Sequence, residues 1–336
     1  MDEFQQNPWM WDILRMDRRQ FSRIAAGFLL YNLLGAGLQI IFVSFLRLWG
    51  WNGYSGIMNL SWMMNIVCMY LLAFPITAFY FRSVPKFGHV RNERWELKAW
   101  IVVFFMASAL SYFGNLLGNL VTGFFGASSN NYEGLMEMVF QADMGLTFLA
   151  VVVGAPIVEE MIFRKFLIDR TIGYGEKLSV LLSGALFGLM HGNLNQFFYT
   201  FALGCLFAYI YCKTGRIRNC IVFHMLINLG GGIIAPMLLR SMDGLLSLSG
   251  FDSARIQAQY LLSHPAAVLP VLFFIAYVLF QLAASVIGLV MFYVFRRYIC
   301  FYPGIRRIPE NRVLQTVVLN PGMICFLLLC LFSFFA

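Results

Sequence analysis

Long apolar stretches alternate with short polar connections along almost the whole chain. A helix needs about 20 apolar residues to cross the hydrocarbon core of a membrane, which is about 30 Å thick. Nine stretches approach that length, and the fifth and sixth are the shortest. They cover roughly residues 24–46, 55–80, 99–125, 145–167, 179–192, 196–212, 219–239, 266–295 and 319–336. The pattern predicts an all-α fold, a polytopic membrane helix bundle of about eight to nine transmembrane helices.

Composition supports a membrane protein rather than a soluble domain. Of the 336 residues, 60% are hydrophobic and only 12% are charged, and the mean hydropathy is +0.73. The seven cysteines form neither a CxxC metal motif nor a disulfide framework. No soluble domain emerges, so we expect residues 24–336 to form a single transmembrane domain.

The first 23 residues form a polar and aromatic segment ahead of the first apolar stretch. We expect residues 1–23 to be a cytoplasmic or interfacial segment, either a short helix at the membrane surface or a mobile tail. The first apolar stretch is long and lacks a small-residue cleavage site, so we expect it to remain as a span rather than be removed as a signal peptide.

Basic residues follow the positive-inside rule when the N-terminus is placed in the cytoplasm. Only Arg47, Arg240 and Arg255 then fall on outside flanks, and the other 21 of the 24 Lys and Arg fall inside. The net charge of +8 therefore indicates orientation and a match to anionic lipid headgroups of the bilayer. It gives no support to nucleic-acid binding, and we predict no nucleic-acid partner.

Ionisable residues inside the apolar stretches are few. Charges in a membrane span are energetically costly and often mark function. Fourteen of the sixteen Asp and Glu lie at termini, flanks or connections, which leaves Glu159 and Glu160. Two of the four histidines, His191 and His224, also lie in apolar stretches. We therefore expect these four residues to mark a functional site.

Helical spacing places the two glutamates on different faces of their helix. Arg164 is four residues after Glu160 and shares its face, which predicts a buried ion pair that fixes the helix. Glu159 is turned about 100° away from that pair. Pro156 lies three residues before Glu159 and is expected to kink the helix and open space there.

The two histidines also lie in helical patterns. Phe187 lies one turn before His191 and is expected to pack in the core, while Asn228 is four residues after His224 and points the same way. Glu159, His191, His224 and Asn228 are thus expected to converge from three helices. At about 1.5 Å per residue, His191 lies deeper than the others, about 20 Å against 10–15 Å. Convergence therefore requires the helix of His191 to tilt or to begin in the cytosol.

Two glycine patterns bear on helix packing. Gly114 and Gly118 form a GxxxG pattern, which is typical of closely packed membrane helices. The run GGGIIAP at 230–236 could break its helix, as transporter helices are broken.

Three motifs in order resemble the CPBP family of intramembrane endopeptidases, which includes CAAX prenyl proteases and bacteriocin-processing or immunity proteins. The family pattern EExxxR, FxxxH and HxxxN matches Glu159 to Arg164, Phe187 to His191, and His224 to Asn228. The resemblance covers roughly 75 of the 336 residues. It implies an all-helical bundle of about eight spans, a catalytic core at about 145–240, and a site in a cavity that faces the cytoplasm.

The chemistry of these side chains suits peptide hydrolysis. We expect Glu159 with His191 to activate a water molecule, and His224 with Asn228 to donate hydrogen bonds to the oxyanion. Glu160, Arg164 and Phe187 are expected to give structural support. The predicted substrates are membrane-associated or lipidated peptides or membrane proteins, and a multi-pass protein of a bacterial cell membrane is the expected setting.

Three alternatives stay open at this point. Glu159, His191 and His224 could bind zinc in a metalloprotease, although HExxH is missing and Asn228 is a poor zinc ligand, so we expect no cofactor. A proton-coupled transporter would use the same Glu and His residues as a relay. A non-catalytic membrane immunity protein would need none of them. Nothing in the sequence indicates the oligomeric state.

Overall fold

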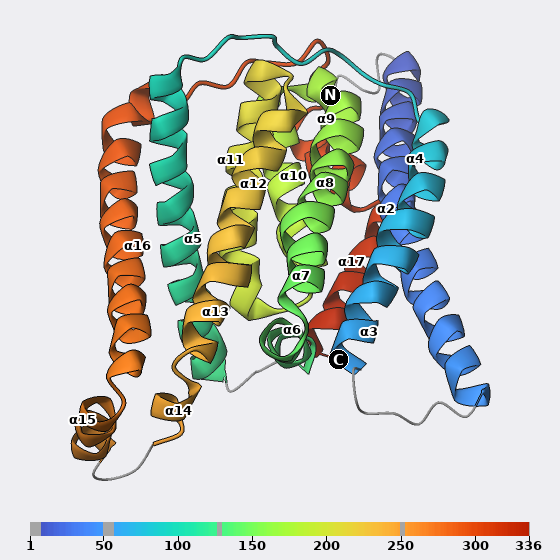
Figure 1. Cartoon of the computed structure of the whole chain (residues 1–336). Helices are drawn as coiled ribbons and strands as arrows, with labels where there is room; N and C mark the ends of the chain where they lie inside the picture. Colours follow the sequence, from blue (N-terminus) through green and yellow to red (C-terminus); the bar gives the residue numbers. More distant parts are fainter. Residues whose placement is uncertain (1–7, 50–56, 126–129, 249–252, 336) are drawn as a thin grey trace.

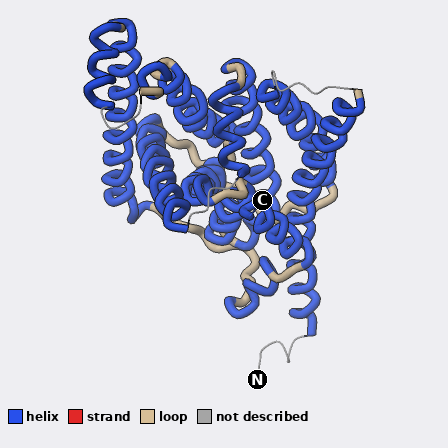
Figure 2. Tube along the Cα trace, turned by 90° about the horizontal axis from the view of Figure 1, so that it is seen from below, coloured by secondary structure: helices blue, strands red, loops and turns tan. Residues whose placement is uncertain are grey.

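The computed structural model describes residues 8–49, 57–125, 130–248 and 253–335, and this part of the chain is almost entirely helical (Figures 1 and 2). It contains no β-strand in these ranges, only an isolated bridge between Gly175 and Pro303. The helices pack side by side as a bundle (Figure 1). The predicted all-α class is confirmed.

The helical elements follow one another with short connections. The α-helices are α2 (Pro8–Leu48), α3 (Ile57–Met64), α4 (Phe74–Arg82), α5 (Leu97–Phe125), α6 (Asn130–Gln141), α7 (Met144–Thr147), α8 (Ala155–Glu160), α9 (Leu167–Thr171), α10 (Glu176–Met190), α11 (Leu194–Thr214), α12 (Ile217–Leu229), α13 (Ala235–Arg240), α14 (Asp243–Leu246), α15 (Ser253–Ser263), α16 (Val268–Phe295) and α17 (Pro321–Phe335). The π-helical segments are η1 (Asn65–Ala73), η2 (Phe148–Gly154), η3 (Met161–Phe166), η5 (Gly230–Ile234) and η9 (Leu314–Val318). Short 3₁₀ turns are η4 (Ile172–Tyr174), η6 (Pro265–Ala267), η7 (Arg296–Tyr298) and η8 (Glu310–Arg312).

Seven continuous helical stretches in the described residues are long and apolar enough to cross a membrane. An eighth span arises if Glu310–Val318 and Pro321–Phe334, which are bent by 68° at their junction, cross together. Every predicted apolar stretch corresponds to a helical segment. The stretch at 179–192 corresponds to α10, whose 15 residues are too few to be counted as a span.

The N-terminal segment differs from its expected form. From Pro8 onward it is continuous with the first span, so that α2 is a single helix of 41 residues. Its buried residues include Leu14 and Phe21, and the Tyr174 hydroxyl donates a hydrogen bond to the buried carboxylate of Asp17 at 2.7 Å. These contacts explain why residues 8–23 form neither a separate surface helix nor a mobile tail.

Three prolines share one structural context. Pro75, Pro156 and Pro236 are each the second residue of an α-helix that directly follows a π-helical segment. Proline lacks the amide hydrogen and clashes with the carbonyl four residues earlier, and the wider π turn accommodates both problems. The helix therefore stays continuous from Met144 to Tyr174, with a π segment where a kink was expected at Pro156.

The glycine run at 230–236 was expected to break its helix, and this prediction is wrong. Residues Ile217–Arg240 form one continuous helical stretch in which the glycines occupy the π segment η5. Two of these glycines face close neighbours, since an added Cβ at Gly232 would lie 3.0 Å from Val151 and one at Gly230 would lie 3.3 Å from the Tyr277 hydroxyl. The run therefore permits close packing without opening the backbone.

The GxxxG pattern packs α5 tightly against α11. An added Cβ at Gly114 would lie 2.6 Å from the Cα of Tyr199, and one at Gly118 would lie 2.5 Å from the carbonyl oxygen of Asn195. No side chain fits at such distances. The predicted close helix packing is confirmed. Because of it, α5 and α11 together form a wall between two cavities, which are described below.

The segments with the most basic residues gather at one end of the bundle (Figure 1). The start of α2, the connection 83–96 and the connection 299–309 lie at this basic end, and α6, α14, α15 and the end of α17 lie at the opposite end. The buried pair of Lys213 and Glu176, 2.5 Å apart, joins α11 to α10 at the basic end. This arrangement agrees with the partition that the positive-inside rule predicts.

Candidate active site

The two glutamates lie midway along the continuous helix Met144–Tyr174. They end α8, a six-residue α-helical segment between η2 and η3. Glu159 is fifteen residues before Tyr174, and His191 is fifteen residues after Glu176. Gly175, at φ 112°, joins the two antiparallel helices in a tight turn, so both side chains reach the same depth. The expected mismatch in depth is thus resolved because α10 begins at the basic end.

Glu160 and Arg164 form the ion pair that their spacing predicts. Arg164 Nε lies 2.9 Å from Glu160 Oε2, and Arg164 Nη2 donates to Glu160 Oε1 at 3.1 Å. Both side chains are fully buried. Arg164 Nη1 also donates to Ser183 Oγ on α10 at 2.9 Å, a partner that the sequence analysis missed. The pair therefore fixes α8 and η3 against α10.

His224 lies between the two glutamates. Its Nδ1 is 3.0 Å from Glu160 Oε1, and its Nε2 is 3.8 Å from Glu159 Oε2. A carboxylate only accepts hydrogen bonds, so Nδ1–H donates to Glu160, and Nε2 faces Glu159 and the cavity. Glu160 thus has a second role that spacing did not reveal, because it orients His224 as well as binding Arg164.

His191 is held at the end of α10. Its Nδ1 lies 2.8 Å from the carbonyl oxygen of Phe187, which assigns the hydrogen to Nδ1 and leaves Nε2 as an acceptor when the ring is neutral. Gly192, at φ 63°, reverses the chain directly after it. Asn193 then donates to the His191 carbonyl at 2.8 Å. Asn193 was not among the predicted site residues, although Asn directly before a helix is a common N-cap signal.

The Phe187 ring contacts His191, His224 and Arg164. Its ring centroid lies 4.9 Å from that of His191 and 5.8 Å from that of His224, both edge to face. Arg164 Cζ lies 4.8 Å from the same ring, in a cation–π arrangement. Phe187 is buried, as expected for a core residue, and it also separates and orients the two imidazoles.

Asn228 completes the group on α12. Its Nδ2 donates to the carbonyl oxygen of Val151 in η2 at 2.9 Å. An amide nitrogen has two hydrogens, so one remains for another acceptor. The four predicted catalytic residues, Glu159, His191, His224 and Asn228, all line one cavity.

This cavity has a volume of about 780 Å³ and continues well beyond the four side chains. One stripe of α5 contributes polar groups at intervals of three or four residues. This stripe consists of Ser108, Ser111, Asn115 and Asn119. Ser111 Oγ, on this wall, and Asn65 Oδ1, on η1, are buried without a hydrogen-bond partner in the described residues. Tyr70 of η1 also lines the cavity, with its hydroxyl donating to Ala150 at 3.2 Å.

The direction of the cavity is unexpected. Beyond the four residues, its walls include α6 and the second half of α5, which lie toward the end opposite the basic end (Figure 1). The family resemblance implied a cavity that faces the cytoplasm. With the predicted orientation, the space instead extends from the middle of the bundle toward the outside.

The same side chains are not arranged as the ligands of a metal ion. Across the described ranges, no three His, Cys, Asp or Glu side chains form a group that could hold a metal ion. His224 Nε2 and Glu159 Oε2 are 3.8 Å apart, whereas two ligands of a tetrahedral zinc ion lie about 3.3 Å apart. The side chains as they stand do not form the His₂Glu set.

Comparison with known proteins bears on the same segment. Residues 141–230 match the family described as type II CAAX prenyl endopeptidase Rce1-like, and this range contains all four cavity residues of the candidate site. A protein of Bacillus subtilis (strain 168), named "Putative membrane peptidase YdiL", is 28% identical over 163 residues, which are 44% of this chain and 61% of that relative. The chain thus spans less than two thirds of the length of this relative. No solved structure matches the chain significantly. Residues 141–230 are thus similar to an Rce1-like domain, and the three motifs that resemble the CPBP family all lie within this range.

Proposed function

We propose that this protein is an intramembrane endopeptidase that hydrolyses peptide bonds with a water molecule activated by Glu159. The observation that supports this most strongly is the arrangement of two carboxylates around His224, with Glu160 neutralised by Arg164 and Glu159 left at the cavity. Glu159 is partly accessible, with 20% of its side chain exposed, whereas Glu160 is fully buried. Only one of the two carboxylates can therefore meet a substrate.

In the first step, Glu159 removes a proton from water while the water oxygen attacks the scissile carbonyl carbon. The neutral His191 ring accepts a hydrogen bond from the same water at Nε2, because Nδ1 is committed to Phe187. A positioned base of this kind accelerates hydrolysis by about 10²–10⁴-fold. The C=O π bond opens as the new C–O bond forms, and the charge moves to the carbonyl oxygen.

The resulting oxyanion needs hydrogen-bond donors. Asn228 supplies its second amide hydrogen, and His224 enters the reaction as an imidazolium between the two carboxylates, so that it supplies Nε2–H while Nδ1–H remains bound to Glu160. Donors fixed in this way stabilise the transition state more than the substrate. Glu159 then transfers its proton to the leaving nitrogen, the C–N bond breaks, and an acid and an amine are released.

The walls of the cavity suit an extended peptide. A peptide in a membrane must satisfy its backbone N–H and C=O groups, and the polar stripe of α5 offers donors and acceptors along the cavity. Membrane-associated or lipidated peptides and membrane proteins are the proposed substrate class. The protein is proposed to act in a bacterial cell membrane.

The test uses Glu159→Gln, which is nearly isosteric with glutamate but does not accept the proton. Peptides from membranes that contain the wild type are compared with those from membranes that contain the variant, and cleavage of an identified peptide is then measured with purified protein. We expect products only with the wild type, and equal melting temperatures. Glu137→Gln, on the exposed face of α6, is the matched control and should remain active.

Two outcomes would reject the proposal. Equal peptide profiles with wild type and Glu159→Gln would favour the non-catalytic immunity protein. The transporter would be favoured if vesicles with the wild type show proton-coupled uptake, vesicles with Glu159→Gln do not, and the peptide profiles of the two are the same. Since the glycine run does not break its helix, the structural argument for the transporter is already weaker.

A further inference from the structure

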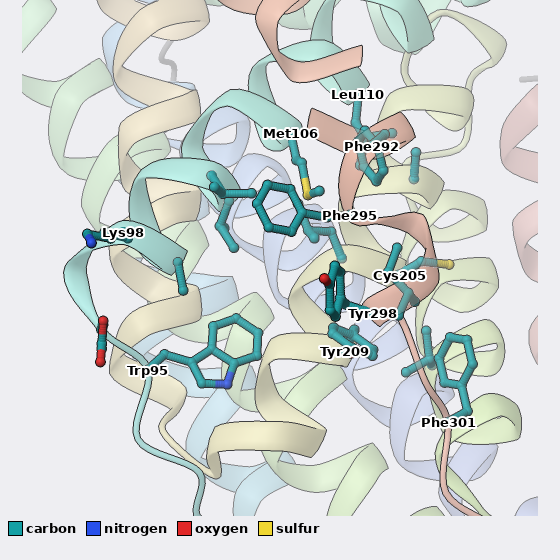
Figure 3. Close-up of a pocket in the computed structure, with 18 of the residues that line it drawn as sticks. Trp95, Lys98, Met106, Leu110, Cys205, Tyr209, Phe292, Phe295, Tyr298 and Phe301 are labelled. Carbon is teal, nitrogen blue, oxygen red and sulfur yellow. The ribbon is translucent and has the colours of Figure 1, made fainter. Parts of the chain in front are cut away.

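A second space of about 810 Å³ lies on the other side of the wall that α5 and α11 form (Figure 3). Met106 and Leu110 line it from α5, Cys205 from α11, and Phe292 and Phe295 from α16. Apart from Lys98 at the start of α5 and the hydroxyl of Tyr209 on α11, the lining along the helices is apolar. We call this space the acyl pocket. No step of the proposed hydrolysis uses it.

The acyl pocket has the depth of one leaflet. Its apolar lining on α5 runs from Ala99 to Leu110, which at 1.5 Å per residue is about 16 Å. That is about half of the 30 Å hydrocarbon core of a bilayer. The pocket therefore begins at one membrane surface and ends near the bilayer centre, as a lipid acyl chain does.

The open end of the pocket carries the features of a membrane interface. Trp95 and Tyr298 flank it, and aromatic residues of this kind are enriched at the level of lipid headgroups (Figure 3). Arg94 and Lys98 are exposed there, and neither forms an ion pair with any described residue. Glu96 is the one acidic residue among those that line the pocket, so the rim is net positive.

We propose that the acyl pocket binds one chain of an anionic phospholipid from the leaflet at the basic end, with the headgroup at Arg94 and Lys98. A peptide does not suit this space, because the apolar walls leave its backbone N–H and C=O groups without partners. The bound chain fills the gap between α5 and α16. It thereby supports α5, whose other face carries the polar stripe of the candidate active site.

The test places the full chain in nanodiscs of phosphatidylcholine that contain a small fraction of phosphatidylglycerol with a photoactivatable acyl chain. Crosslinks are mapped by mass spectrometry after irradiation. We expect crosslinks at Met106, Leu110 and Phe292, and much weaker ones with phosphatidylcholine that carries the same chain. Binding is read directly, so the result does not depend on whether the protein is a peptidase.

Two variants, each with a control, distinguish binding of the lipid acyl chain from binding of the lipid headgroup. Ala202→Phe fills the pocket and should lose the crosslinks, whereas Ala283→Phe, on the exposed face of α16, should keep them. Lys98→Gln should lower the preference for phosphatidylglycerol about fivefold, and Arg218→Gln, exposed at the same end, should not.

Either of two results overturns the proposal. One is crosslinking of the pocket residues by phosphatidylcholine as strongly as by phosphatidylglycerol. The other is unchanged crosslinking in an Ala202→Phe protein that melts like the wild type. If Ala202→Phe does not fold, the proposal is decided by the preference of the Lys98→Gln variant for phosphatidylglycerol over phosphatidylcholine. Lys98 is exposed, so this substitution leaves the core intact.

Discussion

His224 Nδ1 lies 3.0 Å from Glu160 Oε1, and this contact links the buried ion pair to the cavity. The Glu160 carboxylate serves Arg164 on its own helix and His224 on α12 at the same time. The Glu160 side chain thus both stabilises the fold through Arg164 and orients His224 of the candidate active site. A change at Glu160 should therefore affect both.

Glu160→Gln should destabilise the protein and impair turnover. The substitution leaves Arg164 buried without its counter-charge, which costs about 3–5 kcal/mol. It also removes the negative charge that holds His224 Nδ1. Melting temperature and turnover of the purified variant provide the measurement, with Glu159→Gln as the comparison that should melt like the wild type.

The charge exchange Glu160→Arg with Arg164→Glu separates the two effects. We expect it to recover part of the stability but no activity, because His224 then faces a cation instead of a carboxylate. A Glu160→Gln protein that is fully stable and inactive, beside an active Glu159→Gln protein, would make Glu160 the base.

Ser111→Ala should weaken substrate binding without weakening the fold. Ser111 Oγ is buried without a partner in the described residues, so its removal is expected to be neutral or slightly stabilising in the free protein. If the hydroxyl binds the substrate backbone, KM should rise about two- to twelvefold with little change in kcat. Michaelis kinetics and melting temperatures check both parts.

Thr122→Val is the matched control for Ser111→Ala. The Thr122 hydroxyl, also on α5, is likewise buried without a hydrogen-bond partner among the described residues, but it is not among the residues that line the cavity. Its removal should leave KM unchanged. An equal rise in KM in both variants would mean that the effect comes from α5 packing.

Activity should survive metal removal. The cavity side chains do not form a His₂Glu set, and Glu159 acts as a base in the proposed mechanism. Prolonged chelation should leave turnover unchanged, and elemental analysis should find well below one zinc per chain. Loss of activity that zinc restores would move Glu159, His191 and His224 to ligand roles.

Membrane orientation can be tested with single cysteines at exposed positions of the two ends. In a background in which both exposed native cysteines are replaced, Cys300→Ser and Cys325→Ala, the variants Gln141→Cys and Ser263→Cys should react with an impermeant thiol reagent from outside the cell. His89→Cys and Arg307→Cys should react only after the membrane is opened. The reverse pattern would place the candidate active-site cavity toward the cytoplasm.

Hydropathy predicted the helices, and helical spacing predicted the local pairs. The ion pair of Glu160 with Arg164 and the close packing at Gly114 and Gly118 depend on residues four apart on one helix face, which periodicity reveals. Periodicity does not show that α11 is the helix that packs on these glycines. The contact of His224 with Glu160 depends on how α12 packs against α8, and no periodic pattern encodes that. Depth was misjudged for His191 because hydropathy does not show where α10 begins relative to the turn at Gly175.

The π segments next to Pro156 and Pro236 have a consequence for comparing sequences. A π turn holds about one residue more than an α turn, and each residue rotates the following side chains by about 100°. Deleting one residue in η2 would thus turn Glu159 away from His224 while changing the length of the helix very little. Related chains should therefore tolerate insertions and deletions outside these segments far better than inside them, and any one-residue gap at 148–154 or 230–234 should coincide with a rebuilt site.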